Sequence, residues 1–450
     1  MIDIRLLLTN DFFGSFARQT TSWGSIPGGD ALRAEVDRLR TEVQKSVWLD
    51  VGDFAGGGPL SPATEQEMGW AAALELGFDA AVPGNHEFDY GDLPALAWSR
   101  RARFPLIAAD RELLGLGDVF VPYRIFDGAT GRRTAVIGIN CAERRGRTVW
   151  DRAGDLEAAA ERVLAHAAKL QTEADHILVA IHEGVPKSGD SPAPGERLNV
   201  FCATIRGHVD AVLGAHTLQR HVGDIAGVPY IQPWALGVEI GILDIHDDGR
   251  TELGGSIVPT TSDKADTSTG WSGPGSALLN ELTSEIVGHI DRPLAEPTVA
   301  GTASFADAVT RGMLAVTGAD VALSTTIELG CGQVPLDGVK TYLPAGPVTA
   351  ADVIRSLPWP TGTRGDELWL AQLDENDVER LTRLGLDIAI PTGVPSYRAL
   401  RDQNRPYGRT VLSSNYVRNA RRLLGRDVEW TPTGFGLRDA FRAWLREGIA

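Results

Sequence analysis

Short apolar runs alternate with helix-like stretches from the first residues to about Ile245, and this alternation constrains the fold more than any other feature. Such a pattern is typical of an α/β fold, in which each run forms a buried strand. Most of the runs lead within a few residues into a polar or glycine-bearing turn. Ligands of open α/β sheets bind outside the carboxyl ends of strands, so we expect the functional residues in these turns. The predicted strands are Ile2–Leu8, Ser46–Leu49, Ala80–Val82, Thr134–Ile139, His176–Ile181 and Ala211–Leu213.

The length of 450 residues exceeds what one ordinary hydrophobic core organises, so we expect two domains. Residues 260–275 are rich in Ser, Thr, Gly and Asp and are expected to form a loop. A helix is predicted to follow, with Ser276 as its N-cap and a run continuing to Ile290. Further on, a helix signal at Ser304–Val309 and a strand signal at Ala319–Leu323 predict a second domain. The predicted division is 1–258, a connecting segment 259–295, and 296–450.

The composition excludes several classes of partner. No apolar run is long enough to cross a bilayer, so no membrane partner is expected. A net charge of −16 without a basic stripe argues against a nucleic-acid duplex, because phosphate contacts need clustered Lys and Arg. The chain begins with a strand pattern instead of a secretory signal, and Cys141, Cys202 and Cys331 are odd in number and far apart. These features favour a reducing compartment, and we expect a cytoplasmic location.

Potential metal ligands follow five of the predicted strands. Carboxylate and amide oxygens together with imidazoles are what a divalent-metal hydrolase needs to bind its ion and polarise a phosphoryl group. Any one of these residues could instead be a turn cap or a core histidine, because Asp and Asn favour turns. Their succession at strand ends favours the metal site. The residues are Asp11, Asp53, Asn85, His86, His182 and His216.

The order and spacing of these residues resemble the metallophosphoesterase signature, in which D-x-H, G-D, G-N-H-E, a lone H and G-H-x-H supply two adjacent metal sites. The segment Gly84–Asp89, with the sequence GNHEFD, is typical of the bimetal 5'-nucleotidase family. The resemblance extends to Val228–Pro233 and Leu357–Trp359. It implies a metallophosphoesterase β-sandwich flanked by helices, followed by a smaller α/β C-terminal domain that contributes to substrate binding.

Two family ligands are missing from this chain. The D-x-H position reads Asp11-Phe12-Phe13, and the G-H-x-H position reads Ala215 to Leu218. Neither Phe13 nor Leu218 has a lone pair to donate, so we expect the metal site beside Asp11 to be empty or weak. Gln219 or His221 could restore a ligand if the turn is shifted, and either could equally be a surface residue.

The other site of the family appears complete in this sequence. The resemblance implies that its ion is held by Asp53, Asn85, His182 and His216, all of which are present. One divalent ion per chain is therefore expected, and the sequence does not distinguish Zn, Mn, Fe, Mg or Ca.

The same resemblance gives roles to His86 and Asp89. It implies that His86 stabilises the transition state or donates a proton to the leaving oxygen, and that Asp89 orients its ring. A carboxylate beside histidine raises the basicity of the imidazole and fixes its tautomer, which suits both roles. A simple local hydrogen bond between the two is the alternative.

The second domain retains only part of the nucleotide pocket that the resemblance implies. The phosphate or ribose loop of the family is best matched by Ser324–Leu329, which lacks both its Asn and its Arg. Trp359 corresponds to one base-stacking ring or is a core residue, and Tyr416 lies in the segment that carries the other ring. Arg421 and Arg422 could bind an additional anionic group or form a solvated helix face.

The sequence therefore predicts a metal-dependent phosphoester hydrolase acting on a nucleotide-like or other small phosphorylated metabolite. Two alternatives stay open at this point. The presence of Phe13 and Leu218 in place of two family ligands is also compatible with a non-catalytic binding or regulatory protein on the same fold. An enzyme acting on a diester or on a biosynthetic intermediate is the other alternative.

Overall fold

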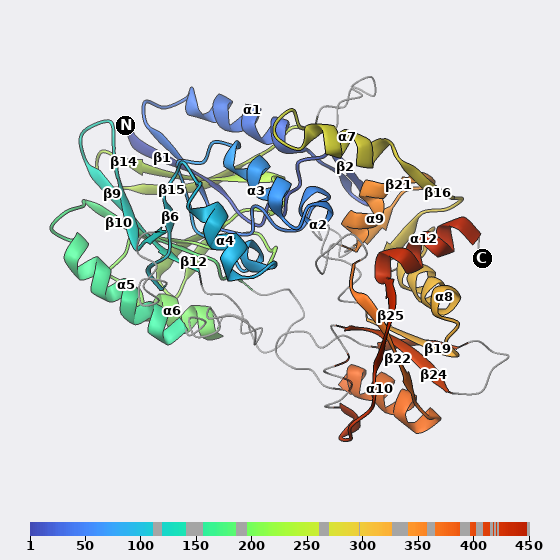
Figure 1. The fold of residues 1–450 in the computed structure, drawn as a ribbon. Helices are drawn as coiled ribbons and strands as arrows, with labels where there is room; N and C mark the ends of the chain where they lie inside the picture. The colour runs from blue at the N-terminus through green and yellow to red at the C-terminus, as the bar shows by residue number, and fades with distance from the viewer. Residues whose placement is uncertain are drawn as a thin grey trace. The chain divides into compact units, whose positions relative to one another are not determined.

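The computed structural model divides the chain into two compact units, shown in Figure 1. The first consists of Met1–Gln19, Ile26–Gly56 and Gln66–Ser276, and the second of Thr20–Ser25, Gly57–Glu65 and Ala277–Ala450. We describe each unit by itself. The residues described are 1–110, 119–140, 156–185, 196–260, 270–296, 298–325, 341–357, 365–387, 397–401, 408–414, 417, 420 and 423–447.

The first unit contains a seven-stranded sheet in the order β15-β14-β1-β4-β5-β6-β7. Strands β1, β4, β5, β6 and β7 run parallel to one another, so their carboxyl ends lie at one edge of the sheet. Strand β14 pairs antiparallel with β1, and β15 pairs antiparallel with β14. The bounds are β1 (Ile2–Thr9), β4 (Ser46–Asp50), β5 (Ala80–Ala81), β6 (Leu106–Ile107), β7 (Phe120–Val121), β14 (Glu239–His246) and β15 (Thr251–Ile257).

A six-stranded sheet in the order β12-β13-β11-β10-β9-β8 completes this unit. Its central strands β9, β10, β11 and β13 are parallel, and the outer strands β8 and β12 are antiparallel. The bounds are β8 (Tyr123–Asp127), β9 (Arg133–Ile139), β10 (His176–Ile181), β11 (Ala211–Leu213), β12 (His221–Ile225) and β13 (Val228–Gln232). The predicted strands of this part of the chain are confirmed.

The side chains of β10 alternate between two hydrophobic cores, as the pleat of a strand requires. Leu178 and Ala180 pack in a core shared with β1 and β4 of the other sheet, so the two sheets form a sandwich. Ile177, Val179 and Ile181 lie in a second core on the outer face of the sheet. All six residues of β10 are buried, which explains why this run is continuously apolar after His176.

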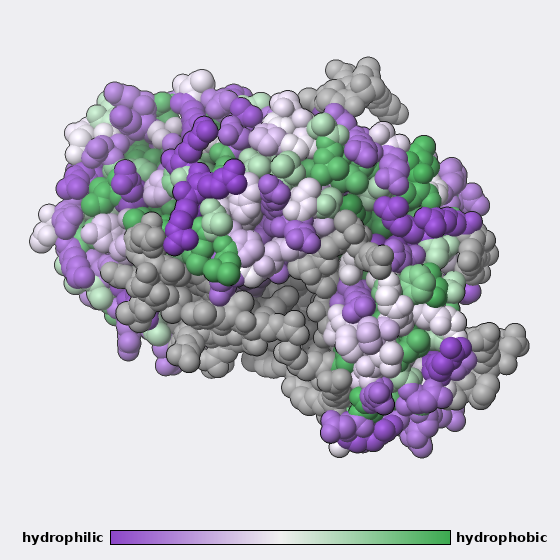
Figure 2. All heavy atoms as spheres, in the orientation of Figure 1, coloured by the Kyte–Doolittle hydropathy of each residue, from purple (hydrophilic) through white to green (hydrophobic). Residues whose placement is uncertain are grey.

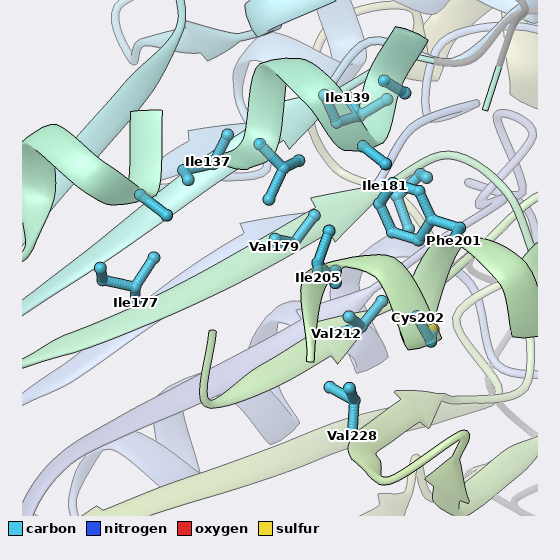
Figure 3. Close-up of a cluster of buried hydrophobic side chains, with 14 of the residues drawn as sticks. Ile137, Ile139, Ile177, Val179, Ile181, Phe201, Cys202, Ile205, Val212 and Val228 are labelled. Carbon is cyan, nitrogen blue, oxygen red and sulfur yellow. The ribbon is translucent and has the colours of Figure 1, made fainter. Parts of the chain in front are cut away.

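Two helices cover this outer face, α5 (Leu156–Leu170) and α6 (Glu196–Ile205), and they contact each other. Figure 3 shows Phe201, Cys202 and Ile205 of α6 directed toward Val179 and the neighbouring strand residues. Cys202 is a buried free thiol in this core. The other two cysteines lie outside the described residues.

The helical segments between the strands of the seven-stranded sheet are α1 (Gly29–Arg40), α2 (Leu60–Ala63), α3 (Glu67–Leu74), the 3₁₀ turn η1 (His86–Phe88) and α4 (Asp92–Ser99). The small strands β2 (Gln19–Thr21) and β3 (Gly24–Ile26) form a separate two-stranded sheet. This small sheet, for the most part, and α2 belong to the second unit. The turn η1 is the one that concerns function, because it begins at a predicted catalytic residue.

The second unit is also α/β and has its own core. Phe305 of α8 and Phe441 of α12 lie in this core, with ring centroids 4.9 Å apart. The helix predicted from Ser304–Val309 is confirmed, since α8 begins at Phe305. The side chain of Ser304 caps this helix by accepting a hydrogen bond from the Asp307 amide. Its helices are α7 (Ser276–Ser284), whose first residue still belongs to the first unit, α8 (Phe305–Thr317), α9 (Ala350–Ser356), α10 (Glu375–Asp387) and α12 (Leu437–Glu447).

Strands of the second unit form sheets in the orders β16-β21, β18-β17-β20 and β23-β19-β24-β22-β25. The predicted strand at Ala319–Leu323 is confirmed as β19, which begins two residues later. The bounds are β16 (Ile286–Ile290), β17 (Leu294–Glu296), β18 (Ala303–Ser304), β19 (Val321–Thr325), β20 (Thr341–Leu343), β21 (Gly346–Thr349), β22 (Glu367–Gln372), β23 (Tyr397–Arg401), β24 (Arg409–Ser413) and β25 (Thr431–Gly436).

The helix predicted to run from Ser276 to Ile290 is wrong in its second half. Ser276 is the first residue of α7 and not its N-cap, and the helix ends at Ser284. Ile286–Ile290 instead forms β16, which pairs antiparallel with β21. The β-branched residues of this stretch favour a strand, and the pairing partner is about 60 residues away, where local periodicity gives no signal.

The surface drawn in Figure 2 mixes hydrophilic side chains with small hydrophobic patches over both units. In the part of the chain that the structure describes, no helix is both long enough and apolar enough to cross a membrane.

Candidate metal centre

The predicted ligands of the first unit converge at the carboxyl ends of its parallel strands. Asp11 follows β1, Asp53 follows β4 and Asn85 follows β5 in one sheet. His182 directly follows β10 in the other sheet, and His216 follows β11. The sandwich thus brings residues separated by more than 200 positions to one place.

Asp53, His182 and His216 form the centre of this group. One ligand atom from each lies within 4.8 Å of the others. The Asp53 carboxylate and the His182 imidazole are almost fully buried, and the His216 ring lies 5.0 Å from that of His182. His182 Nε2 is 3.1 Å from Asp53 Oδ2 and 3.2 Å from Asn85 Oδ1, so Asn85 belongs to the same cluster.

The backbone fixes which nitrogen of His182 faces this cluster. His182 Nδ1 lies 2.7 Å from the Val51 carbonyl oxygen, which can only accept a hydrogen bond. Nδ1 therefore carries a proton, and Nε2 faces Asp53 and Asn85, where the neutral imidazole presents a lone pair. Metal-bound histidines commonly donate their second N–H in this way.

The electrostatics of the cluster call for positive charge. Burial alone would lower the pKa of His182, but the Asp53 carboxylate beside it raises this pKa to about 10. Burial alone would raise the pKa of Asp53, whereas His182 and His86 hold it below its ordinary range. A second proton on His182, or a cation between His182 and Asp53, would balance the negative charge of the Asp53 carboxylate. Oxygen and imidazole donors at this spacing fit a divalent ion such as Mn²⁺, Fe²⁺ or Zn²⁺.

Asp11 lies next to these residues and is fully buried. Its Oδ2 accepts hydrogen bonds from the His216 amide at 2.7 Å and from Asn10 Nδ2 at 2.8 Å. Its Oδ1 has no hydrogen-bond partner among the described residues. Burial raises the pKa of Asp11 to about 6. Asp11 thus supports the turn that carries His216 through Oδ2, while its buried Oδ1 accepts no hydrogen bond from the described residues.

Five residues of the site turns have left-handed backbone conformations, which are uncommon for residues other than glycine. Such strain concentrates at functional sites because the surrounding structure must hold it in place. The residues and their φ angles are Asp11 (47°), Phe13 (48°), Asp53 (60°), His216 (71°) and Leu218 (58°).

Phe13 and Leu218, the two residues predicted to replace family ligands, are both buried. The Phe13 ring meets the His86 ring edge to face, with centroids 5.3 Å apart. The side-chain amide of Gln219 donates to the carbonyl of Leu218, and His221 lies in β12 with its ring against Tyr230. Each of these two alternative ligands thus has a contact of its own.

His86 and Asp89 lie together, as expected. His86 Nδ1 is 2.9 and 3.0 Å from the two carboxylate oxygens of Asp89. The carboxylate can only accept, so Nδ1 carries the proton and Nε2 is the nitrogen left for chemistry. The His86 amide also donates to Asp53 Oδ1 at 2.8 Å, which ties the backbone of this histidine to the metal-ligand cluster.

Comparison with known proteins agrees with this geometry. The family described as calcineurin-like phosphoesterase matches residues 4–220. These residues form a calcineurin-like phosphoesterase domain. The matched segment includes the carboxyl ends of β1, β4, β5, β10 and β11, and therefore every strand end that carries a predicted ligand.

Curated relatives extend the similarity. A stretch of 228 residues, 48% of this chain and 40% of the relative, is 30% identical to the protein UshA of Escherichia coli. The endonuclease YhcR of Bacillus subtilis is 24% identical over 393 residues, 80% of this chain and 31% of that protein. The chain thus spans less than half the length of these relatives.

Among solved structures, the crystal structure of a 5'-nucleotidase precursor from Thermus thermophilus has a TM-score of 0.69 and 19% identity. The match covers 99% of this chain and 96% of that one. The two-domain α/β fold, a phosphoesterase sandwich followed by a C-terminal domain, is therefore confirmed.

Two buried acids beside the predicted ligands, Asp50 and Glu87, were not predicted from the sequence to shape the site. Asp50, in β4, accepts hydrogen bonds from Thr9 Oγ1 and from the Gly52 amide, and thereby shapes the turn before Asp53. Glu87, inside the segment Gly84–Asp89, accepts from three backbone amides, and burial raises its pKa to about 7. A fully buried glutamate is rare, but burial cannot be recognised from one polar residue in a turn.

The predicted substrate-binding residues of the second unit lie outside the described residues. They are Trp359, Tyr416, Arg421 and Arg422.

Close packing around Gly84 leads to a first prediction for the phosphoesterase domain. A Cβ atom on Gly84 would lie 2.1 Å from Asp53 Oδ1, so Gly84→Ala must displace this carboxylate. We expect the variant to bind Mn²⁺ at least about tenfold more weakly than the wild type, measured by isothermal titration calorimetry. Gly254→Ala in β15 is the control, because a Cβ there meets nothing within 4 Å. Equal affinities of the three proteins would contradict the placement of Asp53 among the ligands.

Proposed function

We propose that this chain is a metal-dependent phosphoester hydrolase that acts on a nucleotide-like or other small phosphorylated metabolite. The observation that carries the proposal is the buried contact of 3.1 Å between Asp53 Oδ2 and His182 Nε2, with Asn85 beside it. Asp53 Oδ2 offers a lone pair, and so does Nε2 in the neutral imidazole, because Nδ1–H is bonded to the Val51 carbonyl. The similarity to the 5'-nucleotidase of Vibrio cholerae, 27% identical over 48% of this chain, supports the substrate class.

The residues of the site have two proposed roles, metal binding and proton transfer. Asp53, Asn85, His182 and His216 would hold one divalent ion, which supplies Lewis-acid polarisation of the phosphoryl group. His86, with its Nδ1–H bonded to Asp89, presents Nε2 for proton donation to the leaving oxygen or for stabilising charge on the phosphoryl group. Asp89 raises the basicity of the ring and holds its tautomer.

We further propose that the domain binds a single ion. Support comes from Phe13 and Leu218, whose hydrocarbon side chains are buried at the positions of two family ligands. Asp11 then serves mainly to hold the His216 turn through the amide of His216.

The test combines metal analysis with phosphate release. We expect about one equivalent of Mn²⁺ or Zn²⁺ per chain and metal-stimulated release of phosphate from at least one member of a panel of nucleoside monophosphates and sugar phosphates. Diester substrates on the same panel would distinguish a diesterase. A protein that binds no metal and turns over none of these compounds would refute the proposed function.

A second candidate is a binding or regulatory protein without catalytic activity. It is favoured by the contact between Phe13 and His86, because a phenyl ring occupies space beside the proposed acid. Metal binding with no turnover across the panel is the result expected for this candidate.

A further inference from the structure

Glu87 connects the two turns that carry metal ligands in the seven-stranded sheet. Its side chain is fully buried. Oε2 accepts hydrogen bonds from the Asp53 amide at 2.9 Å and from the Gly84 amide at 2.6 Å. Oε1 accepts from the Ala55 amide at 3.0 Å. One carboxylate thus binds the turn after β4 and the turn after β5 at the same time.

The contact between the two turns is reciprocal. While Glu87 accepts from the backbone of Asp53, the side chain of Asp53 accepts from the backbone of His86 through Oδ1 at 2.8 Å. This second bond occupies Oδ1 and leaves Oδ2 facing His182. The arrangement resembles a capping box, in which two residues satisfy each other's amides, but here it joins two separate turns.

The backbone at Asp53 needs such support. Asp53 has a φ of 60°, a left-handed conformation that is strained for a residue with a side chain. Gly84 lies against the same carboxylate, so the two turns cannot shift independently without a collision. A single side chain that accepts hydrogen bonds from three backbone amides in two turns is a suitable anchor for this backbone.

We infer that Glu87 is a positioning residue of the metal centre, which holds Asp53, Asn85 and His86 in register by binding the backbone of both turns. The inference rests on the proposed function, because it assigns Glu87 to the geometry of the metal site. Glu87 itself does not touch the ion or the substrate in this assignment.

The test compares Glu87→Gln with Asp3→Asn in the full-length protein. Glutamine keeps the shape of Glu87 but offers one acceptor oxygen in place of two, so at least one backbone amide loses its partner. Asp3 is the matched control, because it is also a fully buried carboxylate that accepts from a backbone amide, that of Thr130, and it lies at the opposite end of β1 from Asp11. Glu87→Asp serves as a second variant, which retains the charge but is too short to reach both turns.

Three measurements are required. Hydrogen exchange of the metal-free proteins should show faster exchange in peptides that contain residues 53–55 and 84 for Glu87→Gln, and wild-type exchange there for Asp3→Asn. Calorimetric titration with Mn²⁺ should show affinity reduced by about 10- to 100-fold for Glu87→Gln and unchanged for Asp3→Asn. The visible spectrum of the Co²⁺-loaded variant should also change, since this spectrum reports the ligand geometry.

The outcomes separate the inference from the proposed function. Wild-type metal affinity and an unchanged Co²⁺ spectrum for Glu87→Gln would overturn the inference, as would equal metal loss in Asp3→Asn. If the wild type itself binds no metal, the proposed function fails, and the exchange experiment alone decides whether Glu87 joins the two turns. If Glu87→Gln does not fold, Glu87→Asp is measured in its place with the same expected results.

Discussion

Replacing His86 with alanine is expected to lower kcat by about 10²- to 10⁴-fold, the range typical for loss of a general acid or base. The imidazole lies beside the ligand cluster, and its Nδ1 proton is bonded to Asp89, so Nε2 is the nitrogen available for proton transfer. Metal binding should remain, because the bond from residue 86 to Asp53 Oδ1 comes from the backbone and not from the ring. Steady-state phosphate release and metal titration on the same preparation measure both effects.

Asp89→Asn is the accompanying variant. An amide in place of the carboxylate can still contact His86 Nδ1 but does not raise the basicity of the ring, so we expect a smaller loss of kcat than in His86→Ala. Turnover by His86→Ala at the wild-type rate would contradict the role of His86, and a protein with bound metal but no measurable turnover in any form would favour the binding protein described above.

The double substitution Phe13→His with Leu218→His is expected to raise the metal stoichiometry from one to two ions per chain. It places imidazoles at both positions where the family has them, next to Asp11, whose Oδ1 is buried without a partner among the described residues. The backbone at both positions is left-handed, a conformation that histidine tolerates better than phenylalanine or leucine. Metal analysis after dialysis against Mn²⁺ gives the stoichiometry.

An apolar double variant, Phe13→Leu with Leu218→Met, controls for disturbed packing around His86. It should keep the stoichiometry of the wild type. Two ions in the wild type would show that the single-ion proposal is wrong, and one ion in the histidine variant would show that the loss of the second site does not depend on these two residues alone.

Much of the phosphoesterase domain could be predicted because its strands are buried on both faces. A run such as Ile177–Ile181 is continuously apolar, ends in a polar turn and needs no partner to be recognised. The ligands were found for the same reason, since each occupies the first turn after such a run. Their convergence follows from the parallel arrangement of neighbouring strands.

Other features depend on contacts that a single sequence does not reveal. Ile286–Ile290 forms a strand because it pairs with β21, and no local pattern distinguishes it from the end of a helix. Glu87 accepts a hydrogen bond from a backbone amide of another turn. Every residue except proline has such an amide, so the sequence does not indicate which one Glu87 contacts. The roles of Trp359, Tyr416, Arg421 and Arg422, the single-ion stoichiometry and the cytoplasmic location stay predictions.

The burial of β10 on both faces has a consequence for how this protein could change during evolution. His182 follows directly after a strand whose side chains alternate between two cores, so its position is set by packing deep in the domain. Thr217 and Gln219, in the turn after β11, are only partly buried and belong to neither core. Substitutions there can alter what the site accepts while the nitrogen of His182 stays in place, so specificity can diverge faster than the ability to hold an ion.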